Sequence, residues 1–100
     1  MNMQSLMAQA QKMQRDIQKK KDEINAMEFE GKSELVNVKI NGKKEVLSVK
    51  INDNASLEKD DLEVLEDMIK ITLNQALSKV DEETDKQLGS YGGGSLGGLF

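Results

Sequence analysis

The sequence predicts an α+β domain with a long N-terminal helix, a three-stranded antiparallel sheet and a long C-terminal helix, in that order. Three observations support this class. Apolar residues recur at helical spacing near both ends of the chain, an alternating apolar pattern surrounds Asn41-Gly42, and the C-terminal residues are rich in glycine. A chain of 100 residues has room for one core. We therefore expect a single domain over residues 1–88 and a flexible Gly-rich tail over residues 89–100.

The first element is predicted to be a helix over residues 4–28. Its apolar residues are three or four positions apart, a heptad seam with a period of 3.5 residues. The seam consists of Met3, Leu6, Ala10, Met13, Ile17, Ile24 and Met27, and Lys20 occupies its one polar position. At 1.5 Å per residue such a helix is roughly 37 Å long. Because so small a body cannot cover that length, part of the helix should project or pair with another chain.

The middle of the chain is predicted to be a hairpin within a three-stranded antiparallel sheet. Apolar residues alternate with polar ones on both sides of Asn41-Gly42: Val36, Val38 and Ile40 precede it, and Leu47, Val49 and Ile51 follow. Asn-Gly is typical of a two-residue type I′ turn, which would pair Ile40 with Lys43. Residues 29–34 would add the third strand. Lys39, Lys44 and Lys50 would then share the polar face, either as a solvated surface or as a binding surface.

The last element is predicted to be a helix over residues 61–87. Asp60 is a candidate N-cap, with Glu63 as its capping-box partner. Apolar residues keep helical spacing from Leu62 to Val80, and Val64, Met68 and Ile71 widen the apolar surface. We therefore expect the first half of this helix to be enclosed on two sides, by the sheet and by another helix.

The core must be built almost entirely from aliphatic side chains and methionine, because only three residues are aromatic. A small core of this kind often needs a partner subunit, so we expect a homodimer. The residues expected to form the core or the dimer contact are Leu6, Met13, Ile17, Val38, Leu47, Val49, Leu65, Ile69 and Leu73.

The composition excludes most enzyme chemistry. The chain has no Cys and no His, so it lacks thiol nucleophiles, imidazole bases and the usual ligands of structural zinc. We expect no enzymatic activity, no cofactor, no metal and no small-molecule substrate. No apolar run approaches the roughly 18 residues of a membrane span, and no charged segment followed by an apolar one opens the chain. We therefore expect a cytoplasmic protein without membrane contact.

Charge is distributed unevenly, although the total is only −4. The net charge is +2 for residues 1–27, +1 for residues 28–52 and −7 for residues 53–100. On the first helix, Lys12, Arg15 and Lys19 recur every three or four residues and form a basic stripe. The stripe could contact phosphates along a duplex, or it could be a solvated flank balanced by nearby acidic residues. The residues alone favour the solvated flank.

The order and spacing of several segments resemble the YbaB/EbfC family of bacterial nucleoid-associated proteins. The resemblance covers nearly the whole chain. It is carried by LMAQAQKMQ (residues 6–14), FEG (29–31), VKING (38–42), VLSVKI (46–51), LEDMI (65–69) and LNQAL (73–77), and by the Gly-rich tail ending in Leu99-Phe100.

This resemblance implies a tweezer-like homodimer with projecting helices that binds double-stranded DNA in the nucleoid, without enzymatic activity, to organise the nucleoid or regulate gene expression. It favours the phosphate interpretation of the basic stripe. The DNA-facing residues that it implies are Lys12, Arg15, Lys19, Lys20 and Lys21 of the first helix, with Lys79 and Lys86 of the last. The alternative is a dimeric module that grips a protein partner, and the salt dependence of DNA binding separates the two.

Overall fold

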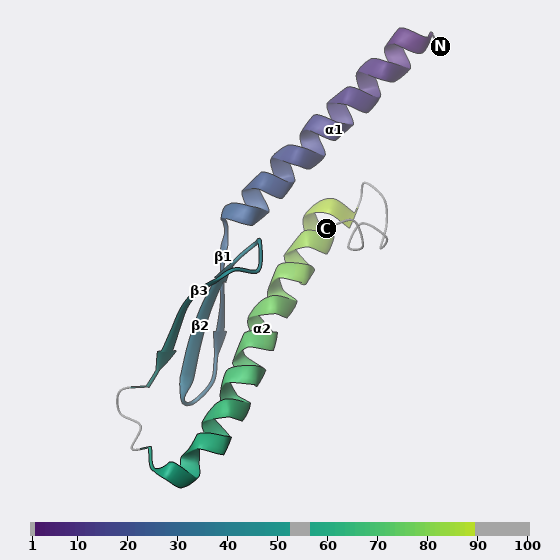
Figure 1. The fold of residues 1–100 in the computed structure, drawn as a ribbon. Helices are drawn as coiled ribbons and strands as arrows, with labels where there is room; N and C mark the ends of the chain where they lie inside the picture. The colour runs from purple at the N-terminus through teal and green to yellow at the C-terminus, as the bar shows by residue number, and fades with distance from the viewer. Residues whose placement is uncertain (1, 53–56, 90–100) are drawn as a thin grey trace.

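The computed structural model describes residues 2–52 and 57–89, in which the C-terminal helix runs along a three-stranded sheet and the N-terminal helix extends beyond the end of the sheet (Figure 1). The elements are α1 (Met3–Ala26), β1 (Glu28–Lys32), β2 (Val36–Asn41), β3 (Val46–Ile51), a short 3-10 helix η1 (Lys59–Asp61) and α2 (Leu62–Leu88). The predicted α+β class and the predicted order of elements are confirmed. Both long helices end within two residues of their predicted bounds, because the apolar periodicity that predicts them is sustained over many turns.

The core lies between one face of the sheet and α2. The strands are antiparallel in the order β1-β2-β3, and α2 packs across β1 and β2. From the sheet, Phe29, Val36, Val38 and Ile40 are buried; from α2, the buried residues include Leu65, Ala76 and Val80. The alternation along β2 therefore separates a face covered by α2 from a polar face, as the period of two residues requires.

The base of α1 is held by α2 and β2, whereas its first half projects (Figure 1). Ile24 is buried and Ile17 packs against the core. Leu88, in the last turn of α2, is 1% exposed. The described part of the molecule measures 71 × 20 × 14 Å, with a radius of gyration of 19.2 Å, against about 13 Å for a compact domain of this length. The projecting half of α1 accounts for this elongation.

The turn between β2 and β3 differs from the predicted type I′ turn. The hairpin is at the predicted place, but Ile40 pairs with Val46 rather than Lys43, and Leu47 is the extra residue of a bulge. Lys44 adopts the left-handed conformation, with φ 65°, and its N–H donates to the Asn41 carbonyl at 3.0 Å. This arrangement is a longer loop built on a type I turn followed by a left-handed residue.

Gly42 is needed for its small size rather than for a left-handed backbone. A Cβ atom at this position would lie 1.9 Å from the carbonyl oxygen of Ile24. The glycine lets the hairpin approach the end of α1. The Asn-Gly signal thus marks the correct turn for two reasons: Asn41 Oδ1 accepts from the Lys43 and Glu45 N–H groups at 2.9 and 3.0 Å within the turn, and Gly42 permits the tertiary contact.

The start of α2 also differs from the prediction. The cap lies at η1, where the backbone N–H of Glu58 donates to Asp61 Oδ2 at 2.9 Å and the Asp61 N–H donates to the Glu58 carbonyl at 3.0 Å. The predicted cap at Asp60 is therefore wrong by two residues. The acidic side chain of the capping box belongs to Asp61 and not, as predicted, to Glu63.

Several apolar side chains remain uncovered in this single chain. The expected enclosure of α2 on two sides is not seen, because Val64 and Ile71 are about half exposed, at 47% and 54%. Every residue of β3 except Ser48 is exposed as well. The tweezer-like homodimer stays a prediction, and the expected flexible tail, apart from Gly89, lies outside the described residues.

The contact between α2 and β1 predicts that substitution of two glycines by alanine affects stability very differently. A Cβ atom at Gly31 would lie 2.1 Å from the Thr72 carbonyl oxygen, whereas one at Gly89 would meet nothing within 4 Å. We expect Gly31→Ala to lower the free energy of unfolding by about 2 kcal/mol or more, because α2 must move away from the sheet. Gly89→Ala should change it by less than about 0.5 kcal/mol. Urea unfolding at one fixed protein concentration measures both, and equal stabilities would contradict the assigned packing.

Candidate nucleic-acid interface

The outward side of α1 carries a row of three basic residues, Lys12, Arg15 and Lys19. All three are exposed. Their helical positions are opposite those of Ile17 and Ile24, which face the body of the domain. Within the described ranges none of the three forms an ion pair. We call Lys12, Arg15 and Lys19 the outward basic row.

The other two basic residues of α1 lie on a different side. Lys20 and Lys21 are each three or four residues from Ile17 and from Ile24, so they belong to the side of α1 that faces the domain. Both are half-buried. The structure therefore divides the five predicted DNA contacts of this helix into an outward row of three and an inward pair, a division that helical spacing alone could have indicated.

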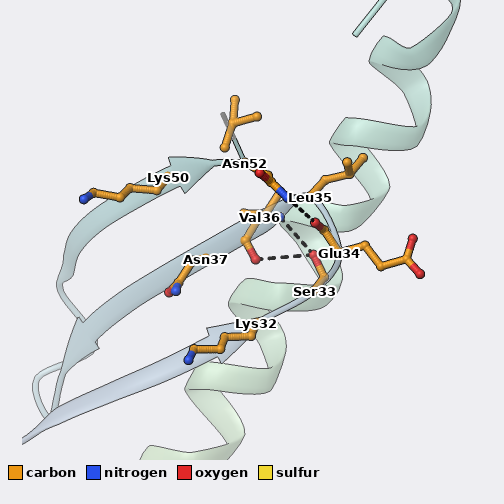
Figure 2. A pocket seen from close by; sticks show the side chains of 9 residues that line it. Lys32, Ser33, Glu34, Leu35, Val36, Asn37, Lys50 and Asn52 are labelled. Atoms are coloured by element: carbon orange, nitrogen blue, oxygen red, sulfur yellow. Dashed lines mark hydrogen bonds between the residues drawn. The ribbon is translucent and has the colours of Figure 1, made fainter. Parts of the chain in front are cut away.

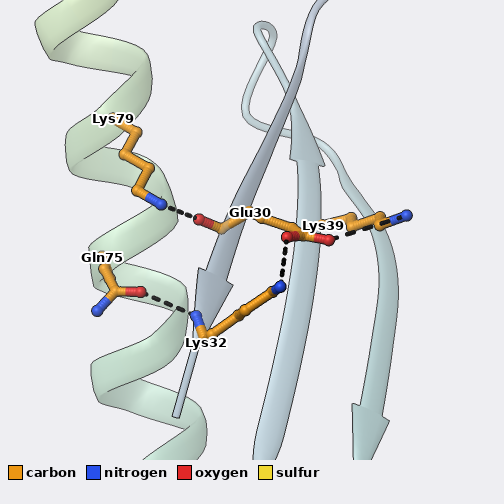
Figure 3. Close-up of polar contacts among 5 residues, drawn as sticks. All are labelled: Glu30, Lys32, Lys39, Gln75 and Lys79. Atoms are coloured by element: carbon orange, nitrogen blue, oxygen red, sulfur yellow. Dashed lines mark hydrogen bonds and ion pairs between the residues drawn. The ribbon is translucent and has the colours of Figure 1, made fainter.

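The two lysines predicted on α2 also differ in their surroundings. Lys79 Nζ donates to the Glu30 carbonyl at 2.6 Å, and Gln75 Oε1 accepts from the Lys32 N–H at 2.8 Å (Figure 3). These side chains satisfy backbone groups along the outer edge of β1, which would otherwise be open to pairing with another strand. Lys86 is exposed in the last turn of α2. Gln75 was not predicted, although its position four residues before Lys79 places both on one face of the helix.

The lysines of the sheet do not form one patch. Lys39 and Lys32 both lie beside Glu30, with Nζ–carboxylate distances of 3.9 and 3.4 Å (Figure 3). Lys44, which was expected on the polar face with Lys39 and Lys50, instead pairs with Asp81 of α2 at 3.0 Å. The reason is the loop geometry, which turns Lys44 toward the helix. These exposed pairs partly neutralise the sheet and contribute little to stability.

A hollow at the end of the sheet is explained by its own turn. It lies where β1 turns into β2 (Figure 2). The Ser33 hydroxyl accepts from the Val36 N–H at 3.2 Å and donates to the Val36 carbonyl at 3.4 Å. Asn52 Nδ2 donates to the Glu34 carbonyl at 3.3 Å. These polar groups hold the turn together and form no acid–base pair.

The predicted packing residues fall into three groups. Val38 and Leu65 are buried, Ile17, Ile69 and Leu73 are partly buried against the core, and Leu6, Met13, Leu47 and Val49 are exposed. Over the residues that the structure covers, there is no group of three or more acidic, Cys or His side chains that could hold a metal. None of the described helices is long and apolar enough to cross a membrane.

A small two-layer domain with a projecting helix and an outward row of unpaired basic side chains has the form of a polyanion-binding protein. Comparison with known families defines the class further. The model of the YbaB/EbfC DNA-binding family matches residues 1–95. The chain belongs to this family and has DNA as its partner. Because this is a DNA-binding family and not an enzyme family, the protein is not an enzyme.

The most similar relatives include proteins named nucleoid-associated protein. One, from Streptococcus equi subsp. zooepidemicus, is 41% identical over 95 residues, covering 93% of this chain and 95% of the relative. Another, from Ligilactobacillus salivarius, is 39% identical over 93 residues, covering 91% of this chain and 88% of the relative. The similarity extends over almost the full length of each chain.

The geometry predicts that Lys79 supports the fold. We expect Lys79→Met to lower the free energy of unfolding by about 0.5–1 kcal/mol, because the Glu30 carbonyl loses a charged donor at the edge of β1. Lys86→Met is the matched control and should leave stability unchanged, since Lys86 forms no ion pair with any described residue. Urea unfolding of both variants is the measurement. If both variants lost the same free energy of unfolding, the structural role assigned to Lys79 would be wrong.

Proposed function

We propose that the protein is a nucleoid-associated DNA-binding protein that holds duplex DNA through its phosphates. The observation that carries this proposal is the outward basic row, Lys12, Arg15 and Lys19, on the projecting helix of a chain in a DNA-binding family. Because these cations have no ion-pair partner within the described residues, they can neutralise phosphates without first breaking an internal contact. Counterions released from the DNA then provide the driving force.

The spacing of the row suits one strand of a duplex. From Lys12 to Lys19 is two helical turns, roughly 10.5 Å at 1.5 Å per residue. Successive phosphates of one strand are separated by about 3.4 Å along the DNA axis. The row is therefore long enough to contact more than one phosphate of a strand. Phosphate contacts position a protein but carry no sequence information, so we propose binding that is largely independent of base sequence.

The remaining predicted contacts take secondary roles in this proposal. Lys20 and Lys21 lie on the inward side of α1, away from the row, and Lys86 lies at the C-terminal end of α2. Lys20 and Lys21 contribute to the positive field that attracts DNA rather than to the first contacts, whereas the acidic residues near Lys86 offset its charge. In this proposal Lys79 does not contact DNA, because its ammonium group already donates to the Glu30 carbonyl of β1. Its role is to hold α2 in place against the sheet.

A homodimer forms part of the proposal, and the uncovered strand β3 supports it. We define the β3 surface as Val46, Leu47, Val49 and Ile51, which are 42–50% exposed. Val49 and Ile51 pair with the buried residues Val38 and Val36, so they extend the apolar face of the sheet beyond the cover of α2. A long apolar edge strand is prone to aggregation unless it is covered. A second copy that buries this surface would bring two basic rows into one tweezer-like assembly.

We further propose that such a dimer acts in the nucleoid, where it organises DNA or regulates gene expression. The second candidate function is a module that grips a protein partner. It is favoured by one observation, the exposed apolar side chains Met3, Leu6 and Met7 at the free end of α1. The two functions differ in their response to salt, because an apolar contact depends on it weakly.

The outward basic row predicts the effect of a charge reversal. We expect the combined substitution Lys12→Glu, Arg15→Glu and Lys19→Glu to abolish binding to a random-sequence duplex. Anisotropy titration of a labelled duplex at several salt concentrations measures it. For the wild type, the log-log slope should be negative, with about 0.9 for each neutralised phosphate.

The matched control is Lys50→Glu, Lys59→Glu and Lys70→Glu, which changes the net charge equally at three exposed positions on β3, η1 and α2. It should retain most of the affinity and the slope. Equal losses in both triple variants would show that only the total charge matters. An absence of wild-type binding even at low salt would overturn the proposed DNA contact and favour the protein-partner module.

The β3 surface predicts the effect of a buried charge on assembly. We expect Val49→Glu to convert a dimer into a monomer, because the carboxylate would be buried without a partner in the interface. Ser48→Glu is the control, since Ser48 pairs with Lys39 on the opposite face of the sheet. Sedimentation equilibrium gives the mass, and circular dichroism checks that each variant is folded. A folded Val49→Glu variant that stays dimeric would contradict the assignment of this surface.

A further inference from the structure

The free end of α1 has a chemical character distinct from that of the rest of the helix. Residues 2–11 contain no charged side chain, and the basic residues begin at Lys12. Met3, Leu6 and Met7 are 73%, 43% and 57% exposed. We call the apolar side of this end, Met3, Leu6, Met7, Ala10 and Met13, the tip seam. It lies on the side of α1 opposite the outward basic row.

The tip seam continues the seam that holds α1 to its own domain. Ile17 and Ile24, farther along the same side, pack against the core. Helix α2 ends at Leu88, beside the base of α1, so it does not reach the tip (Figure 1). One continuous heptad seam is thus covered over its second half and open over its first half. An isolated helical end of this length is marginally stable in water, and packing of its apolar side would stabilise it.

We propose that the tip seam binds the tip seam of a second copy that belongs to another dimer. This inference rests on the proposed DNA-binding dimer and extends it. A period of 3.5 residues is the pattern by which two helices pack knobs into holes. Because no charged side chain lies within residues 2–11, two identical tips can approach without repulsion. The contact is symmetric, as is usual between identical chains.

The size of the tip seam makes this contact dependent on DNA. It extends over only about a heptad and a half of helix. Two such short segments bury far less surface than the roughly 1,000 Å² that is typical of a stable interface. In dilute solution the dimers therefore stay separate. Bound along DNA they reach high local concentration, and several weak contacts act together. Since the outward basic row lies on the other side of α1, tip pairing leaves it free, and two paired tips would bridge two duplexes.

A single introduced cysteine tests the contact, because the chain has none of its own. Ala10→Cys lies in the tip seam, and Ala8→Cys lies two residues away on the opposite side of α1; both positions are exposed. Each full-length variant, bound to a long duplex, is treated with a short bismaleimide. We expect Ala10→Cys to give linked chains and Ala8→Cys to give far fewer. The linked Ala10→Cys material should have a native mass of at least four chains after release from DNA.

A linked species with the native mass of one dimer would place both tips in the same dimer and overturn the proposal. So would equal linking at the two positions, or no linking at either. The same comparison without DNA, at high protein concentration, should again favour Ala10→Cys. If the wild type failed to bind DNA, the proposed function would fail, and this second arm would still decide the tip contact.

A charge in the tip seam gives an independent test of bridging. We expect Leu6→Glu to abolish the capture of a second, labelled duplex by bead-bound DNA carrying the protein. Its affinity for a single short duplex and its dimer mass should equal those of the wild type. Ser5→Glu adds the same charge on another side of the helix and should keep the capture. Capture that survives Leu6→Glu, or a fall of that variant to monomers, would overturn the inference.

Discussion

The close contact between α2 and β1 at Gly31 sets the arrangement of the rest of the domain. A residue without a side chain lets the helix backbone at Thr72 lie directly against the strand, and the same placement lets Gln75 and Lys79 reach the edge of β1. A single helix centred on β1 and β2 cannot also cover β3. The apolar residues of β3 are left exposed by this geometry, and their exposure supports the proposal that a second copy covers them.

The same docking determines how far α1 projects. Because α2 runs across the sheet and ends at Leu88, it reaches only the base of α1, where Ile17 and Ile24 contact the core. Among the residues that the structure describes, none covers the first half of α1, whose side chains are exposed. The tip seam lies on this projecting part, and the outward basic row begins there at Lys12 and continues along the anchored half of α1 to Lys19. A rigid helix anchored at one end presents them on opposite sides, at distances from the body that a loop could not maintain.

The sequence predicts the elements well because long apolar periodicities are local signals. It predicts details less well where tertiary contacts decide. Gly42 suggested a left-handed turn, but its size is needed for the approach of α1 to the hairpin. Lys79 was grouped with DNA contacts, yet its hydrogen bond to β1 depends on where α2 docks. By contrast, the separation of Lys12, Arg15 and Lys19 from Lys20 and Lys21 follows from helical spacing, so the outward row could be predicted in full.

The acidic second half of the chain is compatible with DNA binding because charge is separated in space. Residues 53–100 carry a net charge of −7, and Asp81, Glu82 and Asp85 are exposed along the C-terminal half of α2. These acids repel phosphates from the α2 side of the molecule, and the short Debye length at physiological salt, about 8 Å, keeps their effect local. This separation of charge agrees with the proposed contact of DNA with the outward side of α1. The same repulsion limits the total attraction between the protein and DNA.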